Sequence, residues 1–162
     1  MTICTHRRTH LFGNIIDDTM ILSDAGKIVD ELWSEMFRWA EDFQSWIVMP
    51  NHLHGIVAIT DVGKIVPRPL GRMIAAFKSV STKRINQMRG TPDRAVWQRY
   101  FYEHIIRSDR SLGRILSYIQ DNPIRWGEDP ENPTTAMRTK AVQDSNGSLR
   151  TTPTARWVRG RP

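Results

Sequence analysis

The sequence predicts an α+β domain in which helices pack against an antiparallel sheet. Three observations carry this prediction: strand-like and helix-like segments alternate along the chain, several short segments have strand patterns with turn signals between them, and three stretches have helical spacing with start or stop signals. The chain has 162 residues, of which 40% are hydrophobic and 25% charged. This length suits one ordinary hydrophobic core and hardly two.

The first third of the chain begins with a strand at residues 2–5, followed by a hairpin across residues 11–22. Asp17 and Asp18 supply the turn of that hairpin, because aspartate tolerates tight-turn backbone conformations. Ser23 is a typical helix cap, and the apolar spacing after it predicts a helix to about Trp39.

The middle and end of the domain repeat this alternation. Residues 43–48 and 53–59 form the next strand pair, a helix runs from Leu70 to just before Gly90, and a strand is expected over 96–106. A last helix extends from Ser108 to Asn122, where Pro123 discourages further helix. The buried stripe expected on the second helix consists of Leu70, Met73, Ile74, Phe77 and Val80.

Two regions of the chain differ in composition. Residues 1–130 form the folded domain, whereas 131–162 are rich in Thr, Pro, Ser, Asn and Arg without periodicity, which predicts a disordered basic tail. The formal net charge is +6, and the basic residues gather in the middle of the chain. Residues 64–114 hold twelve basic and three acidic side chains, which suits phosphate contacts but equally a solvated helix face.

Other classes of protein are disfavoured. No apolar stretch reaches membrane-spanning length and no secretory signal is evident, so we expect a cytoplasmic protein that does not bind membranes. Cys4 is the single cysteine, which excludes an internal disulfide and a cysteine-based zinc site.

The stretch from Met49 to Val57 contains two histidines with one hydrophobic residue between them. Because side chains alternate in a strand, His52 and His54 share a face while Leu53 points to the other. Two imidazoles on one face can hold one metal ion. A bare pair of this kind is more often structural, but a strand start directly after the Pro50-Asn51 turn favours a ligand role.

The last predicted helix carries a possible nucleophile. Tyr118 and Asn122 lie four residues apart and share a helix face. A tyrosine hydroxyl can act as a nucleophile, and the Asn122 carbonyl oxygen could complete a hard-metal site. Asp121 is an alternative third ligand. A tyrosine in an amphipathic helix is, on its own, more often a packing residue.

In combination these motifs resemble the REP-associated tyrosine transposases, in the single-tyrosine branch of the HUH single-strand DNA nucleases. The resemblance covers about residues 1–130. It lies in Val48-Met49-Pro50-Asn51-His52-Leu53-His54-Gly55-Ile56, in Tyr118-Ile119-Gln120-Asp121-Asn122-Pro123, and in shorter matches such as Phe77-Lys78-Ser79 and Trp97 to Arg107. It implies a ferredoxin-like, RRM-type antiparallel sheet with helices packed on it.

The resemblance also implies a chemistry. His52, His54 and Asn122 would hold Mg²⁺ or Mn²⁺, and Tyr118 would attack a phosphate of single-stranded or hairpin DNA to form a 5′-phosphotyrosine. Phosphate contacts are expected from a set of basic residues: Lys78, Lys83, Arg84, Arg99 and Arg107.

Two other functions remain open. The first is a catalytically silent RRM-like module that binds nucleic acid, and the second is a zinc hydrolase that uses His52 and His54 with a carboxylate. Covalent trapping of DNA would separate them from a transposase. The sequence leaves the oligomeric state open between a monomer and a homodimer.

Overall fold

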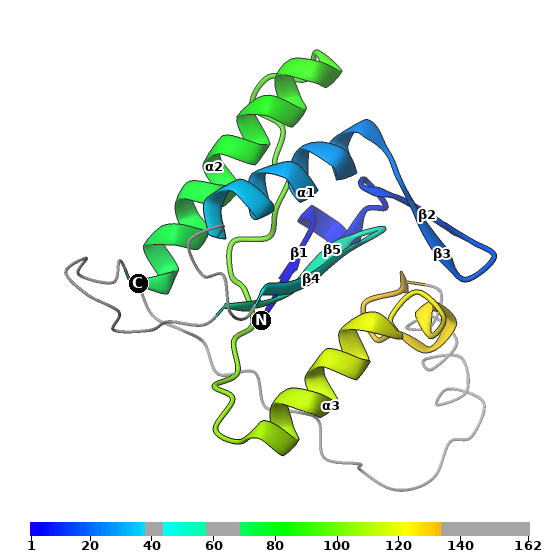
Figure 1. Cartoon of the computed structure of the whole chain (residues 1–162). Helices are drawn as coiled ribbons and strands as arrows, with labels where there is room; N and C mark the ends of the chain where they lie inside the picture. Colours follow the sequence, from blue (N-terminus) through cyan, green and yellow to red (C-terminus); the bar gives the residue numbers. More distant parts are fainter. Residues whose placement is uncertain (38–43, 58–68, 134–162) are drawn as a thin grey trace, which may run out of the picture.

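The computed structural model describes residues 1–37, 44–57 and 69–133, and within them it has the predicted α+β architecture (Figure 1). Three antiparallel strands, β1 (Thr2–Cys4), β5 (His52–Val57) and β4 (Gln44–Met49), form a sheet in the order β1-β5-β4. A separate hairpin joins β2 (Gly13–Ile16) to β3 (Thr19–Leu22). Its turn residues Asp17 and Asp18 both have positive φ, as a tight hairpin turn requires.

Three helices begin near the predicted positions, and α2 and α3 also end near them. Helix α1 (Asp24–Phe37) follows Ser23, whose hydroxyl accepts a hydrogen bond from the Gly26 amide at 3.2 Å. Helix α2 (Leu70–Arg89) ends at Gly90, which adopts a left-handed conformation with φ of 61°. Helix α3 (Asp109–Gln120) is capped by the Ser108 hydroxyl, which accepts from the Ser111 amide.

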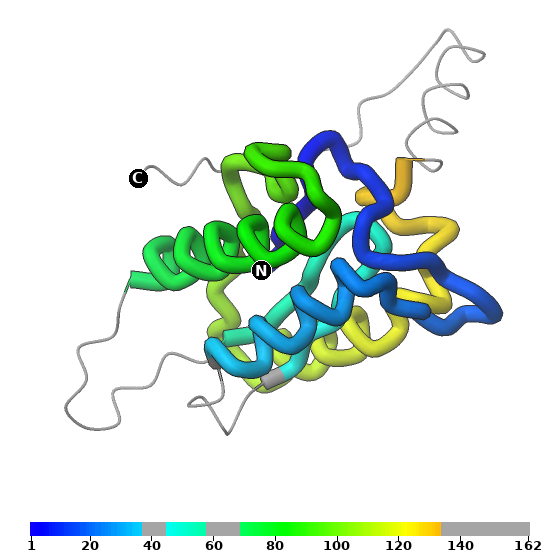
Figure 2. Tube along the Cα trace, turned by 90° about the horizontal axis from the view of Figure 1, so that it is seen from above, coloured from blue at the N-terminus to red at the C-terminus, as the bar shows by residue number. Residues whose placement is uncertain are grey.

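The helices cover the two faces of the sheet unequally. Figure 1 shows α1 and α2 on one face and α3 on the other, and Figure 2 shows α1 and α2 running side by side. The main core lies between the sheet and the α1–α2 layer. Its large fully buried side chains are Ile3, Phe12, Val29, Trp33, Leu53, Ile74, Phe77 and Ile85.

Strand β5 separates the core from the candidate site by its alternation. Leu53 is fully buried in the core, and a Cβ built on Gly55 would come within 2.5 Å of the Trp33 ring on α1. His52 and His54 project to the other face, where the His54 ring lies 5.3 Å from the Tyr118 ring of α3. The glycine after the second histidine therefore permits close packing of α1 behind the pair.

The strand predicted over 96–106 is not formed as a continuous element. Only two isolated bridges, Thr5 with Trp97 and Thr2 with Tyr102, join this part of the described chain to β1. Within this segment the ammonium of Lys78 donates to the backbone carbonyls of Gln98, Arg99 and Tyr100. Those carbonyls bond to a side chain and not to a neighbouring strand.

One residue of the predicted α2 stripe is misplaced. Ile74 and Phe77 are buried as expected, but Val80 is 42% exposed and the next residue, Ser81, is fully buried. The Ser81 hydroxyl is hydrogen-bonded to the Phe77 carbonyl and accepts from the Trp97 indole, so a polar residue can occupy this core position.

Some predictions fall outside the described residues: the end of the first helix at Trp39, the end of β5 at Ile59, and the tail from residue 134 onward. None of the helices in the described ranges is long and apolar enough to cross a membrane.

Candidate metal and nucleophile site

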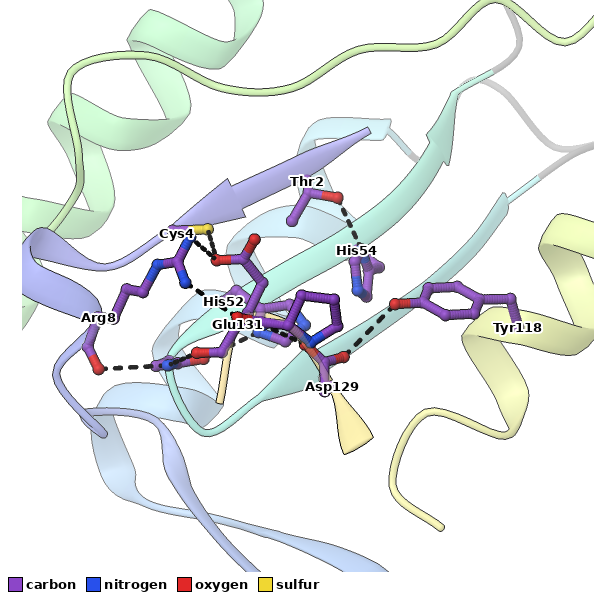
Figure 3. A network of polar contacts seen from close by, with 10 residues as sticks. Thr2, Cys4, Arg8, His52, His54, Tyr118, Asp129 and Glu131 are labelled. Atoms are coloured by element: carbon purple, nitrogen blue, oxygen red, sulfur yellow. Dashed lines mark hydrogen bonds and ion pairs between the residues drawn. The ribbon is translucent and has the colours of Figure 1, made fainter. Parts of the chain in front are cut away.

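The two histidines of β5 form the floor of the site. His52 is fully buried and His54 is 7% exposed, and their ring centroids are 4.4 Å apart. Figure 3 shows both rings on the face of β5 that meets Tyr118. The shared face predicted from the His-x-His spacing is therefore present, and the pair is covered by protein.

Asn51 determines which nitrogen of His52 carries the proton. The Asn51 amide nitrogen donates to two carbonyl oxygens, at 2.7 Å to Glu131 and 3.2 Å to Arg8. This orientation leaves the Asn51 Oδ1 atom, which can only accept, 2.9 Å from His52 Nδ1. Nδ1 must therefore be protonated, and in the neutral ring Nε2 keeps a free lone pair.

His54 is held in a similar way by β1. Its Nδ1 lies 2.8 Å from the Thr2 hydroxyl, which can donate or accept. Burial lowers the pKa of His54 to about 3 and lowers that of His52 well below its usual value, with the positive charges of His54 and Arg8 as further causes for His52. Both rings are thus neutral at pH 7, which is the form that binds metals.

Three buried side-chain atoms in the described part of the chain have no hydrogen-bond partner: His52 Nε2, His54 Nε2 and Asn122 Oδ1. His52 Nε2 and Asn122 Oδ1 are acceptors, His54 Nε2 is an acceptor when Nδ1 carries the proton, and all three atoms belong to the predicted metal site. A buried polar atom without a partner is costly, so three together indicate a cation that supplies what the protein does not. The residues present therefore fit a divalent metal ion.

Asp129 is a functional candidate that the sequence analysis missed. Its ligand atoms and those of His52 and His54 all lie within 4.8 Å of one another. Burial raises the pKa of Asp129, while hydrogen bonds from the Glu131 amide and the Asn122 side chain oppose this shift. In the described ranges the His and carboxylate cluster thus contains Asp129, and not Asp121, the alternative weighed from the sequence.

Tyr118 lies at the open side of this cluster. Its hydroxyl donates to Asp129 Oδ2 at 3.4 Å, and the side chain is 40% exposed. Burial and the Asp129 charge raise its pKa, and a hydrogen bond with Asn122 acts in the opposite direction. The predicted pair of Tyr118 and Asn122 is therefore brought together, although Asn122 lies just beyond the end of α3.

Two grooves are available to a ligand. A cavity of about 630 Å³ extends from His54, Tyr118 and Asp129 past Tyr102 and Arg114. A second groove, of about 900 Å³, lies between α2 and the segment after Gly90. We call it the α2 groove.

Only some of the five predicted DNA-binding residues lie in the α2 groove. Lys78, Lys83 and Arg99 line the α2 groove together with Arg94, whereas Arg84 and Arg107 do not. Lys78 uses its ammonium to hold three backbone carbonyls, and burial lowers its pKa to about 8. Lys83 is the exposed basic side chain of α2 in this groove.

Comparison with known proteins yields relatives for most of the chain. An uncharacterized protein of Haemophilus influenzae is 35% identical over 148 residues, which span 80% of this chain and 81% of that protein. A putative REP-associated tyrosine transposase of the same organism is 24% identical over 135 residues, or 75% of this chain and 77% of that protein. No protein-family model matches the chain.

A solved structure described as a REP-associated tyrosine transposase bound to a REP hairpin has the same fold. It matches with a TM-score of 0.50 and 16% identity, and covers 99% of this chain and 90% of that one. The chain thus has the fold of this class of transposases. It belongs to one family with the uncharacterized Haemophilus influenzae protein, and the weaker match supports the REP-associated tyrosine transposases as that family.

Proposed function

We propose that this protein is a metal-dependent DNA transposase of the single-tyrosine branch, which cleaves and rejoins single-stranded or hairpin DNA. One observation carries the proposal: three buried side-chain atoms without hydrogen-bond partners, on His52, His54 and Asn122, lie near Tyr118, whose hydroxyl donates to Asp129 in the same cluster. A module that only binds nucleic acid needs neither this ligand set nor a nucleophile. The solved relative described as bound to a REP hairpin supports hairpin DNA as the substrate.

His52, His54 and Asp129, with Asn122 beside them, would hold the metal. Nitrogen and carboxylate ligands together suit Mn²⁺ at least as well as Mg²⁺, because imidazole is not a usual ligand for magnesium. When bound, the ion would polarise the scissile phosphate and neutralise the charge that develops on it.

The protein residues would carry out the transfer itself. Tyr118 Oη forms a bond to phosphorus, the bond from phosphorus to the 3′ oxygen breaks, and that oxygen leaves as a 3′-hydroxyl after taking up a proton. Asp129 Oδ2 accepts the hydrogen bond of the tyrosine hydroxyl and so holds Oη beside the ligand set, and the hydroxyl proton passes to water as the bond to phosphorus forms. Attack by another 3′-hydroxyl on the phosphotyrosine reverses the step and joins two DNA ends, so no nucleotide cofactor is consumed.

The α2 groove is our candidate for binding the hairpin. It lies between α2 and residues 90–99, and Lys83, Arg94 and Arg99 give it positive charge. We further infer an RRM-type arrangement, in which residues 96–102 occupy the place of a fourth strand beside β1. A cytoplasmic location belongs to the same proposal, and the choice between a monomer and a homodimer stays open.

A zinc hydrolase is the second candidate, and the position of Asp129 favours it. Two histidines and one carboxylate are a common ligand set for catalytic zinc, with water in the fourth position. In such an enzyme Tyr118 would be incidental, and no covalent link to DNA would form.

Covalent trapping of DNA tests the proposal. We expect the wild-type protein, incubated with Mn²⁺ and a 5′-extended hairpin oligonucleotide, to give a protein–DNA adduct on a denaturing gel, and EDTA to abolish it. Tyr118→Phe removes only the hydroxyl, so it should bind the hairpin with unchanged affinity and form no adduct. Tyr100→Phe is the matched control, because Tyr100 is also exposed and lies outside the site. Cleavage by the Tyr118→Phe variant would exclude the tyrosine mechanism and favour the hydrolase.

A further inference from the structure

The chain segment that carries Asp129 contacts residues near the N-terminus, because Glu131 forms an ion pair with Arg8 and a hydrogen bond with Cys4. After α3 the backbone forms a short 3-10 turn at Trp126–Glu128, and Glu131 then contacts Cys4 at the end of β1 and Asn51 just before β5. Figure 3 shows the resulting polar network, in which Glu131 lies between Arg8, Cys4 and the histidine strand. Glu131 was expected in a disordered tail, but it is only 7% exposed.

The side-chain carboxylate, the backbone carbonyl and the backbone amide of Glu131 each form polar contacts. Its carboxylate forms an ion pair with Arg8 at 3.0 Å and accepts from the Cys4 thiol at 3.2 Å. Its carbonyl accepts from the Asn51 amide at 2.7 Å, and its own amide donates to Asp129 Oδ1 at 2.6 Å. Arg8 also donates to the Pro130 carbonyl. We call Arg8, Asn51 and Glu131 the clasp.

The two carboxylate oxygens of Asp129 have different hydrogen-bond partners. Oδ1 is fixed by the Glu131 amide, and Oδ2 faces the Tyr118 hydroxyl. Without the amide contact the carboxylate could rotate about two side-chain torsions, and the ion pair adds a side-chain anchor to the hydrogen bonds that Asn51 and Arg8 donate to the carbonyls of Glu131 and Pro130. Ordering a carboxylate before a ligand binds reduces the entropy lost on binding.

We propose that the clasp positions Asp129 as the carboxylate ligand of the histidine pair, so that a metal site whose ligands are about 75 residues apart is assembled before the metal arrives. Glu131 and Arg8 are positioning residues in this arrangement and do not touch the metal or the DNA. The inference rests on the metal site of the proposed function, but not on the tyrosine chemistry.

Mn²⁺ affinity of the full-length protein, measured by calorimetry without DNA, tests the clasp. Glu131→Gln keeps the shape of the side chain and removes the ion pair, so we expect affinity to fall about tenfold, as outer-shell substitutions in metal sites commonly cause. Arg8→Gln alters the more exposed partner and should weaken binding in the same direction. Glu128→Gln is the matched control, because it removes an equal charge from an exposed position three residues earlier.

A double-variant cycle distinguishes positioning from a direct effect. If Glu131 acts through Asp129, then Glu131→Gln should cost little further affinity once Asp129→Asn is present. Equal losses in both backgrounds, or a Glu131→Gln variant that matches Glu128→Gln, would overturn the clasp. Absence of Mn²⁺ binding by the wild-type protein would refute the clasp and the metal site together. Clasp-dependent Mn²⁺ binding without a DNA adduct would leave the clasp standing and refute only the transposase.

Discussion

At the scale of single residues, Asn51 connects the chemistry of the site to its architecture. One side of its amide fixes the His52 tautomer, and the other side holds the segment that brings Asp129. No other common side chain can accept from an imidazole and donate to two carbonyls from this fully buried position, apart from glutamine with its longer reach.

Replacing Asn51 should therefore remove the preference of His52 for one tautomer and also lower the stability of the protein. Asn51→Ala leaves His52 Nδ1 and two carbonyls without partners, so we expect the free energy of unfolding to drop by about 2–4 kcal/mol. The imidazole nitrogen spectrum of ¹⁵N-labelled protein should change from one dominant His52 tautomer to a mixture. Asn14→Ala, at an exposed hairpin position, is the control. A single unchanged tautomer in the Asn51→Ala variant would contradict this role.

The sequence revealed some site residues more readily than others, for a physical reason. His52 and His54 lie two apart on a strand, and Tyr118 and Asn122 lie four apart at a helix end, so local periodicity predicts that each pair shares a face. Asp129 lies nine positions beyond the end of α3, after turns and a short 3-10 helix, and its position depends on contacts from Glu131 to Arg8, Cys4 and Asn51. Long-range contacts of this kind leave no periodic signal.

At the scale of elements, the close packing of β5 on α1 explains Gly55. A methyl group at this position would lie 2.5 Å from the Trp33 ring, and the indole is fully buried and cannot move freely. We expect Gly55→Ala to lower the free energy of unfolding by about 1–3 kcal/mol, the usual cost of overpacking. Denaturant unfolding measures the effect.

Gly113 provides the control for this substitution. It lies inside α3 with nothing within 4 Å of a built Cβ, so Gly113→Ala should raise stability by about 0.5–1 kcal/mol. If both variants changed stability equally, crowding against Trp33 would not be the reason for glycine at position 55.

The elements that the sequence predicted best have complete local signals. The caps at Ser23 and Ser108, the Asp17-Asp18 turn and Gly90 all mark real boundaries. The 96–106 segment has strand-like composition, but its neighbour β1 is only three residues long and Lys78 engages three of its carbonyls. Strand composition cannot show whether a partner is available.

At the scale of the whole molecule, the neutral buried histidines make stability depend on pH. In the metal-free protein the unfolded chain takes up protons at both histidines below about pH 6.5, while folded His54 does so only near pH 3. Stability should therefore be fully present above pH 6.5 and fall by about 1.4 kcal/mol per pH unit for each histidine below it. The raised pKa of Asp129 opposes this loss at the acidic end of the range.

Urea unfolding in EDTA from pH 7.5 to 4.5 measures this dependence. The double variant His52→Gln/His54→Gln should show a much shallower slope between pH 6.5 and 4.5, because its folded and unfolded states bind more similar numbers of protons. A wild-type stability that is constant over this interval would show that the two imidazoles are accessible to protons in the folded state.

Helix α3, which carries Tyr118, and helix α2 lie on opposite faces of the sheet (Figure 1). DNA binding in the α2 groove can therefore be tested separately from the chemistry at Tyr118. If the groove binds the hairpin stem, Lys83→Gln should weaken hairpin affinity several-fold and reduce the salt slope by about one. Arg84→Gln removes the same charge from the next residue of α2, which does not line the groove, and should have a clearly smaller effect. With saturating DNA both variants should form the Tyr118 adduct at the wild-type rate, because neither residue is among those that line the cavity around Tyr118. Fluorescence anisotropy over a range of salt concentrations gives both quantities, and equal losses for the two variants would mean that DNA responds to the overall charge of the helix and not to this groove.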